Sequence, residues 1–147
     1  MLVGLYSERG RADVVAARDF IAERGYAATA DDIRRCRQDL MSCEDGRRFA
    51  MLASRSDFYV TSECRDLLFH VREHRFDLPR IGAILEALDL RILGFVHDDA
   101  VASRYRERYP ADASMVDLAQ WDAFERERPL TFAGMYIFWV QKGAVKP

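Results

Sequence analysis

The chain has 147 residues, half of them hydrophobic, and its 22 basic and 24 acidic side chains leave a net charge of −2. This length suits one domain that can bury about 70% of its unfolded surface, and the apolar content excludes a disordered chain. A pI of about 5.9 argues against a nucleic-acid binder, which usually presents a basic face.

The cysteines, Cys36, Cys43 and Cys64, are odd in number and widely spaced, with no C-x-x-C pair. This pattern favours reduced thiols over a disulfide framework or a thiolate zinc site. The opening "MLVGLYSERG" has no basic leader before its short apolar run, and no stretch approaches the roughly 20 apolar residues that span a bilayer. We therefore expect a soluble, cytoplasmic protein.

The first part of the chain predicts a strand followed by helices. Residues 1–7 are apolar and β-prone, as in a buried strand. A helical apolar stripe follows and ends at Gly25. Thr29 and Asp32 form a capping-box pattern for a second helix that extends to about Leu40. Residues 43–59 have little periodicity and predict a loop with a short helix.

Residues 61–74, "TSECRDLLFHVREH", predict a helix with Thr61 or Ser62 as its N-cap. At about 100° per residue, one apolar face collects Cys64, Leu67, Leu68 and Val71. A cysteine in the middle of such a stripe behaves as a small core hydrophobe. We expect Cys64 to be buried and not to act as a nucleophile.

Glu63, His70 and His74 fall on a neighbouring stripe of the same predicted helix. Two histidines four residues apart with a carboxylate are able to bind a divalent metal. The alternative is a pair of boundary histidines bonded to carboxylates or backbone. Acid–base catalysis by either imidazole also stays open, because histidine titrates near neutrality.

The second half predicts a helix, a strand, two helices and a final strand. Asp77 caps the first helix, whose apolar stripe is Leu78, Ile81, Leu85 and Leu88. "LRILGFV" is a strand, and two helices end before Pro110 and Pro129. Their "RYRER" and "FERER" runs are typical of solvated faces. "FAGMYIFWVQK" is apolar on both alternating sets, which predicts a strand inside a sheet covered on both sides.

The predicted fold is α/β with a small three-stranded sheet, which is few strands for a free-standing layered domain. We expect a single partial domain over residues 1–147, with a strand at 1–7, a mainly helical part at 11–89 and a strand–helix–helix–strand part at 90–141. No two glycines stand close enough for G-x-G or a P-loop. Tyr6 and Ser7 end the first strand, where ligands bind in open α/β sheets; the alternative is a tyrosine packed beneath the next helix.

Several blocks together resemble a known family: "GLYSERGR", "DDIRRCRQDLM", "DFYVTSECRDLLFHVREHRFDLPRI", "LGF" and "TFAGMYIFWVQK". They are similar, nearly end to end, to the C-terminal part of bacterial class I S-adenosylmethionine-dependent methyltransferases of the kind often joined to tetratricopeptide repeats. The resemblance implies the fifth, sixth and seventh strands of a seven-stranded sheet with a helical insertion, the last strand antiparallel in the middle.

The resemblance also implies a function. The family's glycine-rich loop and its ribose-binding acidic residue have no counterpart here, so we expect no cofactor-binding residues and no bound S-adenosylmethionine in this chain alone. Methyl transfer depends mainly on positioning, and catalytic residues are not assigned. The resemblance places these residues along an acceptor pocket: Tyr6, Ser7, Tyr59, Ser62, Arg65, Asp66, His70 and His74.

Three functions follow as expectations. The first is the substrate-side portion of a methyltransferase, inactive alone or completed by a cofactor-binding half on another chain. The second is a non-catalytic binding or assembly module, because a first strand without a neighbour leaves an edge open to self-association or to a partner's strand. A small metal-dependent enzyme that uses Glu63, His70 and His74 is the third possibility. Neither nucleic acid nor a membrane is an expected partner.

Overall fold

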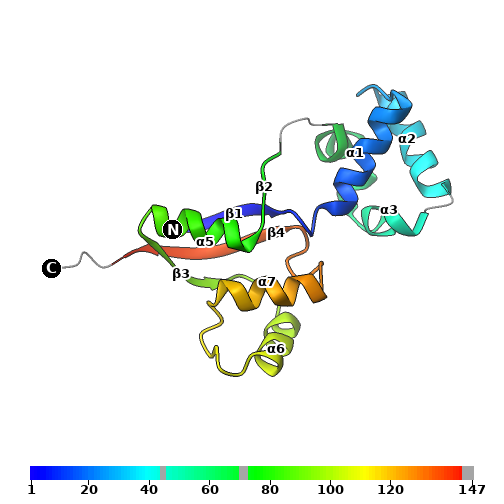
Figure 1. Ribbon diagram of the computed structural model, residues 1–147. Helices are drawn as coiled ribbons and strands as arrows, with labels where there is room; N and C mark the ends of the chain where they lie inside the picture. Colours follow the sequence, from blue (N-terminus) through cyan, green and yellow to red (C-terminus); the bar gives the residue numbers. More distant parts are fainter. Residues whose placement is uncertain (44–45, 70–72, 144–147) are drawn as a thin grey trace. The chain divides into compact units, whose positions relative to one another are not determined.

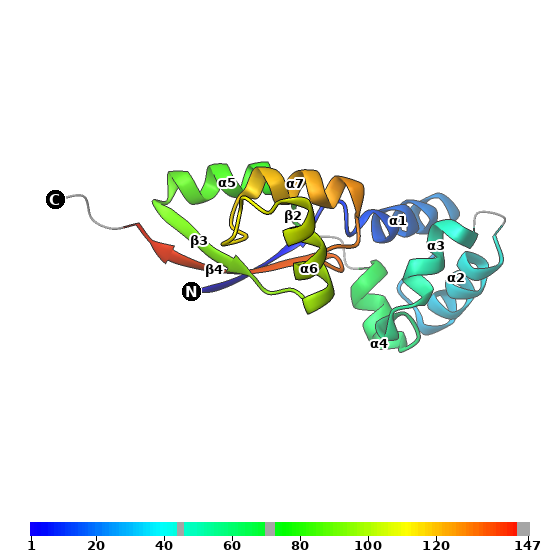
Figure 2. The same ribbon diagram turned by 90° about the horizontal axis from the view of Figure 1, so that it is seen from below.

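The computed structural model describes residues 1–43, 46–69 and 73–143, which form an α/β fold (Figures 1 and 2). The chain divides into two compact units. The first, called the sheet unit, comprises Met1–Gly10 and His74–Pro147, and the second, called the helical unit, comprises Arg11–Glu73. Each is described separately below.

The described residues of the sheet unit form a mixed four-stranded sheet in the order β2-β1-β4-β3. Its strands are β1 (Leu2–Ser7), β2 (Arg75–Phe76), β3 (Leu90–Phe95) and β4 (Met135–Lys142). β4 lies between β1 and β3 and is antiparallel to both, as expected for the last strand. The expectation of only three strands is wrong, because β2 adds a short parallel pairing to the end of β1.

Three helices belong to the described part of this unit. They are α5 (Leu78–Ala87), α6 (Asp99–Arg108) and α7 (Leu118–Glu127). Two of them, α5 and α7, lie over one face of the sheet, and α6 packs against α7 near the β3 edge (Figure 2). Each helix begins at an aspartate whose carboxylate accepts a hydrogen bond from a backbone N–H in the first turn. The cap at Asp77 confirms the prediction. The Arg80 backbone N–H donates to Asp77 Oδ1 at a distance of 2.9 Å.

Aromatic side chains fill the layer between the helices and this face. Tyr105 and Trp121 stack with ring centroids 3.7 Å apart, and both are fully buried. The core contains Leu78, Ile81, Leu85, Phe95, Tyr105, Trp121, Phe124, Phe132, Tyr136, Phe138 and Val140. Leu88, the fourth member of the predicted apolar stripe, is instead 55% exposed at the end of α5. Burial of large aromatic groups dominates the stability of such a core.

The opposite face of the sheet is apolar and exposed. Successive side chains of a strand point to opposite faces, so the buried Tyr136, Phe138 and Val140 alternate with Met135, Ile137 and Trp139 on the other side. Trp139 is 50% exposed. The expectation that both faces of this strand are covered is therefore wrong, because α5, α6 and α7 contribute their core residues to one face only.

The helical unit has its own core. Its elements are α1 (Ala12–Arg24), α2 (Ala30–Ser42), α3 (Gly46–Ala53), a 3-10 helix (Ser56–Phe58) and α4 (Thr61–Cys64), which a π-helical turn (Arg65–Phe69) continues. Gly25 ends α1 with a positive φ of 70°, and Thr29 caps α2 by accepting from the Asp32 N–H. Both predicted helix boundaries are confirmed.

The predicted apolar stripe of the run 61–74 is present as far as it is described. Cys64, Leu67 and Leu68 are buried in the core of the helical unit, whereas Val71 lies outside the described residues. The predicted N-cap is wrong by one position, because the cap is Val60, which contributes no side-chain bond, and Thr61 is already helical.

A buried ion pair joins the two ends of the helical unit. Arg11 donates from Nε and Nη2 to the two carboxylate oxygens of Glu73, at 3.2 and 2.6 Å, and Arg18 donates to the same carboxylate at 3.1 Å. The bidentate geometry is the strong form of this contact. Among the described residues, no helix combines the length and apolar character that crossing a membrane requires.

Candidate functional site

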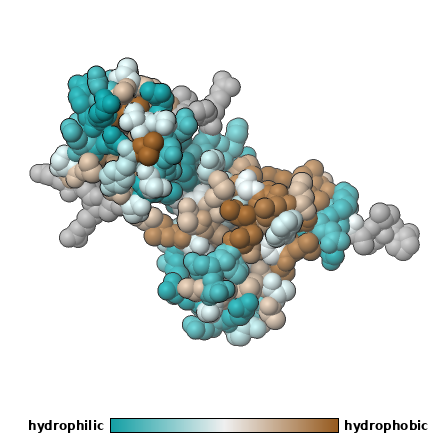
Figure 3. Space-filling model, turned by 180° about the vertical axis from the view of Figure 1, so that it is seen from behind, coloured by the Kyte–Doolittle hydropathy of each residue, from teal (hydrophilic) through white to brown (hydrophobic). Residues whose placement is uncertain are grey.

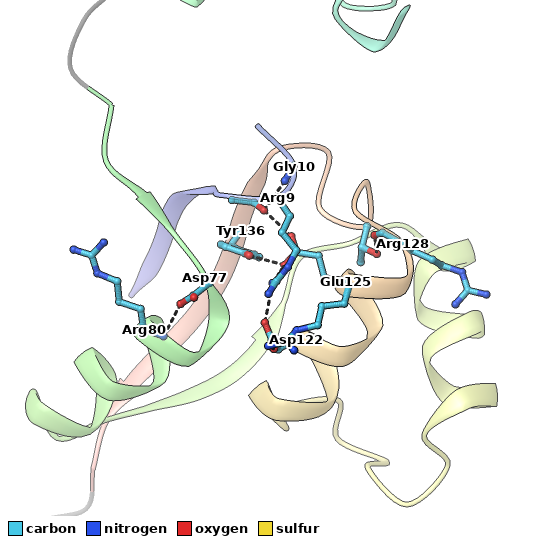
Figure 4. A network of polar contacts seen from close by, with 11 residues as sticks. Arg9, Gly10, Asp77, Arg80, Asp122, Glu125, Arg128 and Tyr136 are labelled. Carbon is cyan, nitrogen blue, oxygen red and sulfur yellow. Dashed lines mark hydrogen bonds and ion pairs between the residues drawn. The ribbon is translucent and has the colours of Figure 1, made fainter. Parts of the chain in front are cut away.

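Polar side chains gather at the carboxyl end of β1, which is the position that α/β sheets use for ligands. Ser7 and Arg9 come from this end and the turn that follows it, Asp122 and Glu125 from α7, and Tyr136 from β4 (Figure 4). We call these five residues the Glu125 cluster.

Glu125 is fully buried and accepts hydrogen bonds from three donors. Its Oε1 accepts from the Ser7 hydroxyl at 2.6 Å, while its Oε2 accepts from the Tyr136 hydroxyl at 2.6 Å and from Arg9 Nη1 at 3.2 Å. A buried carboxylate without such partners would carry a large desolvation cost. The three donors therefore fix the orientation of Glu125 and connect α7 to β1 and β4.

The turn after β1 is closely packed against the start of β4. Ser7 donates its backbone N–H to the Gly134 carbonyl at 2.9 Å, and its hydroxyl oxygen accepts from the Gly10 N–H at 2.9 Å. A Cβ atom at Gly10 would lie 2.7 Å from the Gly134 Cα, so only glycine fits this position. The backbone N–H groups of Ser7 and Gly10 therefore donate hydrogen bonds inside the protein.

Arg9 neutralises the carboxylates of the cluster. Its Nη1 lies 2.8 Å from Asp122 Oδ1, and Arg126 pairs with Asp122 Oδ2 at 2.8 Å. Burial alone would lower the pKa of the Arg9 guanidinium, but the hydrogen bonds and negative charge of Asp122 and Glu125 outweigh it, and this pKa is raised. The Arg9 side chain is 25% exposed, which makes it the most exposed member of the cluster.

The chemistry of the Glu125 cluster is mainly that of positioning. Burial, followed by the hydrogen bond to Glu125, raises the pKa of the Tyr136 hydroxyl above its ordinary range, so this group stays protonated at neutral pH. The Ser7 proton is donated to a carboxylate that two other donors already hold. This arrangement orients the end of β1, and it does not resemble an activated nucleophile, which needs a free adjacent base.

Tyr6 and Ser7, both expected along an acceptor pocket, point to opposite faces of the sheet. Ser7 is buried in the Glu125 cluster, whereas Tyr6 is 36% exposed and lies opposite Met135 on the uncovered face. The alternation of side chains along β1 separates them. The structure therefore brings Ser7, but not Tyr6, to the cluster.

Tyr59 lines an open hollow of about 310 Å³ in the helical unit. The other residues around this hollow are Arg34, Arg37, Gln38 and Met41. The Tyr59 hydroxyl donates to the Ala53 carbonyl at 2.9 Å, and its side chain is exposed. Arg37 donates to the backbone carbonyls of residues 58 and 59, which holds one side of the hollow in place.

Three other predicted site residues lie on the surface of the helical unit. Ser62 and Asp66 are exposed, and Arg65 is exposed while its Nε donates to the Ala28 carbonyl at 3.1 Å. None of the three lines the hollow beside Tyr59. A role in substrate binding stays a prediction for these residues.

The histidine arrangement behind the metal hypothesis is not present as predicted. His70 lies outside the described residues, and His74 is exposed in the irregular segment before β2 and is not on a helix with Glu63. Within the described ranges, no group of three or more histidine, cysteine or acidic side chains is placed to hold a metal ion.

Burial makes two of the cysteines poor nucleophiles. Desolvation raises the pKa of the Cys36 thiol to about 12 and also raises that of Cys64. Both are fully buried, whereas Cys43 is partly exposed. Since the thiolate is the reactive form, the expectation that Cys64 is a core residue is confirmed.

Four members of the Glu125 cluster were not identified from the sequence: Arg9, Asp122, Glu125 and Tyr136. Glu125 is the second residue of the run "FERER". The prediction that this run forms a solvated face is wrong for Glu125, because its side chain is fully buried. The available signal was the helical spacing of Trp121, Phe124 and Glu125, which share the buried side of α7.

Comparisons with known proteins assign no family. A scan against models of known protein families gives no match, and a search of curated proteins gives none either. The function is therefore argued from the fold and the residues described above.

Proposed function

We propose that this chain is the C-terminal, substrate-side portion of an S-adenosylmethionine-dependent methyltransferase and that it is completed by a cofactor-binding half. The observation that supports this proposal is the place of β4, which is antiparallel between β1 and β3. This is the arrangement that the sequence resemblance implies for the last three strands of the family's sheet.

The edge of β1 supports the same proposal. β2 pairs only with Tyr6 and Ser7, so within the described residues no strand pairs with Leu2–Leu5 on the side away from β4. Such an edge presents backbone donors and acceptors that another strand can use. A cofactor-binding half would continue the sheet from this edge.

The residues at the end of β1 do not fit the cofactor itself. A nucleotide-like group is usually held by free backbone N–H groups in a glycine-rich turn. Here the N–H groups of Ser7 and Gly10 are used inside the protein, and Gly10 is packed against Gly134. In this proposal the chain contributes the acceptor side, with the Glu125 cluster fixing the end of β1 and the exposed part of Arg9 turned to solvent.

Calorimetric titration of S-adenosylmethionine tests the proposal on two samples. The first is the chain alone, and the second is the chain extended at its N-terminus by the polypeptide that the preceding DNA encodes in frame. We expect no saturable heat with the first sample and micromolar binding with the second. Micromolar binding to the chain alone contradicts the assignment to the substrate side.

A non-catalytic assembly module is the second candidate, and the open edge of Leu2–Leu5 favours it. Strand addition to this edge requires no cofactor. The assembly module is favoured over the methyltransferase portion if the extended chain folds but binds no S-adenosylmethionine while the chain alone self-associates in sedimentation. A chain that sediments as a monomer at high concentration counts against the assembly module.

A further inference from the structure

The uncovered face of the sheet forms a continuous apolar surface. Leu2, Gly4 and Tyr6 of β1 lie directly opposite Trp139, Ile137 and Met135 of β4. On β3, Leu93 occupies the bulge between Ile92 and Gly94, and the Val96 N–H, just beyond the strand, donates to the Ile137 carbonyl. We call these residues the open face: Leu2, Gly4, Tyr6, Leu93, Val96, Met135, Ile137 and Trp139.

The open face exposes more apolar surface than scattered single side chains would. Five of its side chains are between 36% and 51% exposed: Leu2, Tyr6, Leu93, Val96 and Trp139. Figure 3, seen from behind, shows hydrophobic residues gathered together over the sheet unit. Since a large apolar side chain offers about 150–250 Å² when fully exposed, these five present on the order of 500 Å².

We propose that the open face binds the open face of a second copy of this chain and forms a two-sheet sandwich. Two such faces bury about 1,000 Å² together, which reaches the lower limit for a specific interface. A two-fold axis brings the same patch of both copies together, so each contact between two different residues occurs twice. Because the open face contains no charged side chain, two copies of it can pack together without electrostatic repulsion. Face-to-face packing of two sheets is a common arrangement.

The lack of charge on the open face also favours a second copy of the chain as the partner. No charged side chain belongs to the open face, and Arg91, which pairs with Gln141, lies beyond Trp139 at its end. A polyanionic partner would require several cations inside the surface. The dimer would use the face of the sheet, whereas completion of a methyltransferase would use the edge of β1, so the two proposals stand or fall separately.

Analytical ultracentrifugation of the full chain tests the dimer. We expect reversible dimerisation in the micromolar range, and we expect Trp139→Lys and Leu93→Lys each to weaken it at least about 30-fold, as truncation of a central contact does. Ile84→Lys is the matched control, because Ile84 is 38% exposed on α5, which covers the opposite face. This control should leave the dimer intact, and circular dichroism should show that all three variants are folded.

Acrylamide quenching of tryptophan fluorescence locates the interface without a mutation. Trp121 is fully buried and Trp139 is half-exposed, so quenching reports mainly Trp139. Quenching should fall as the protein concentration rises through the dimerisation range. A wild-type chain that stays monomeric overturns the proposal. This holds even if the chain binds phosphatidylcholine vesicles in a flotation assay, because the open face would then bind lipid and not a second copy. A dimer that both open-face variants leave unchanged also overturns the proposal.

Discussion

Replacing Tyr136 by phenylalanine removes one hydroxyl group from the Glu125 cluster and keeps the buried ring. The hydroxyl donates to Glu125 Oε2 at 2.6 Å, and both residues are fully buried. After the change, Glu125 keeps its bonds from Ser7 and Arg9. The substitution therefore measures one hydrogen bond to a buried carboxylate with little change in packing.

The expected loss follows from the charge of the acceptor. A hydrogen bond to a charged group contributes about 1.5–3 kcal/mol, so we expect Tyr136→Phe to lower the free energy of unfolding of the sheet unit by about 2 kcal/mol. With a urea dependence of roughly 1–2 kcal/mol per molar for a small domain, the midpoint should fall by about 1–2 M.

Tryptophan fluorescence is the assay, because both tryptophans, Trp121 and Trp139, belong to the sheet unit. The matched control is Tyr26→Phe, which removes a hydroxyl that donates to the Asp39 carboxylate in the helical unit. This control should leave the tryptophan-detected transition unchanged. A loss below about 0.5 kcal/mol for Tyr136→Phe would refute the view that the cluster holds the sheet unit together.

The remaining predictions concern the helical unit. Ellman's reagent at pH 8 should modify the partly exposed Cys43 rapidly. Cys36 and Cys64 should react only on unfolding, because both thiols are buried and their pKa values are raised. Rapid reaction of all three cysteines would contradict the packing of the helical unit. Glu73→Gln should lower the unfolding free energy of the helical unit by about 3–5 kcal/mol, measured by circular dichroism, because it removes the negative charge that pairs with the buried Arg11 and the partly buried Arg18. A loss below about 1 kcal/mol would contradict this.

The same carboxylate predicts a dependence on acid. Burial would raise the pKa of Glu73, but the guanidinium groups of Arg11 and Arg18 outweigh it, and the pKa is lowered. The stabilisation is therefore complete above the unfolded pKa of about 4 and is lost as the pH falls through the folded value. Glu73→Gln should abolish this part of the acid transition, and an unchanged transition would show that other groups cause it.

Local signals predict three of the helix boundaries and one buried side of β4 correctly. Gly25, Thr29 and Asp77 act through atoms within a few residues of themselves, so their roles can be inferred from the sequence. The apolar set of β4 likewise identified the residues that pack beneath the helices. Its second apolar set predicts a covered face as well, and this prediction is wrong, because Trp139 of that set is half-exposed.

Features that depend on distant parts of the chain were missed. β2 has two residues, too few for any periodicity, and it forms only because Arg75 and Phe76 meet the end of β1. The sequence predicts a surface position for Glu125 because two of its hydrogen-bond donors, Ser7 and Arg9, lie more than 100 residues away in the sequence. The proposed acceptor-pocket residues could be named from the resemblance, but the placement of Tyr6 and Ser7 on opposite faces of β1 required the structure.

Amide hydrogen exchange measured by NMR tests most directly whether the edge of β1 at Leu2–Leu5, which no described strand pairs with on the side away from β4, is open. Ser7 donates its N–H to Gly134, and by antiparallel alternation Val3 and Leu5 also donate toward β4 while the Gly4 N–H points to the open edge. We predict strong protection at Val3 and Leu5 and exchange near the unfolded rate at Gly4, even in a dimer formed through the open face. Protection of Gly4 equal to that of its neighbours would contradict the account.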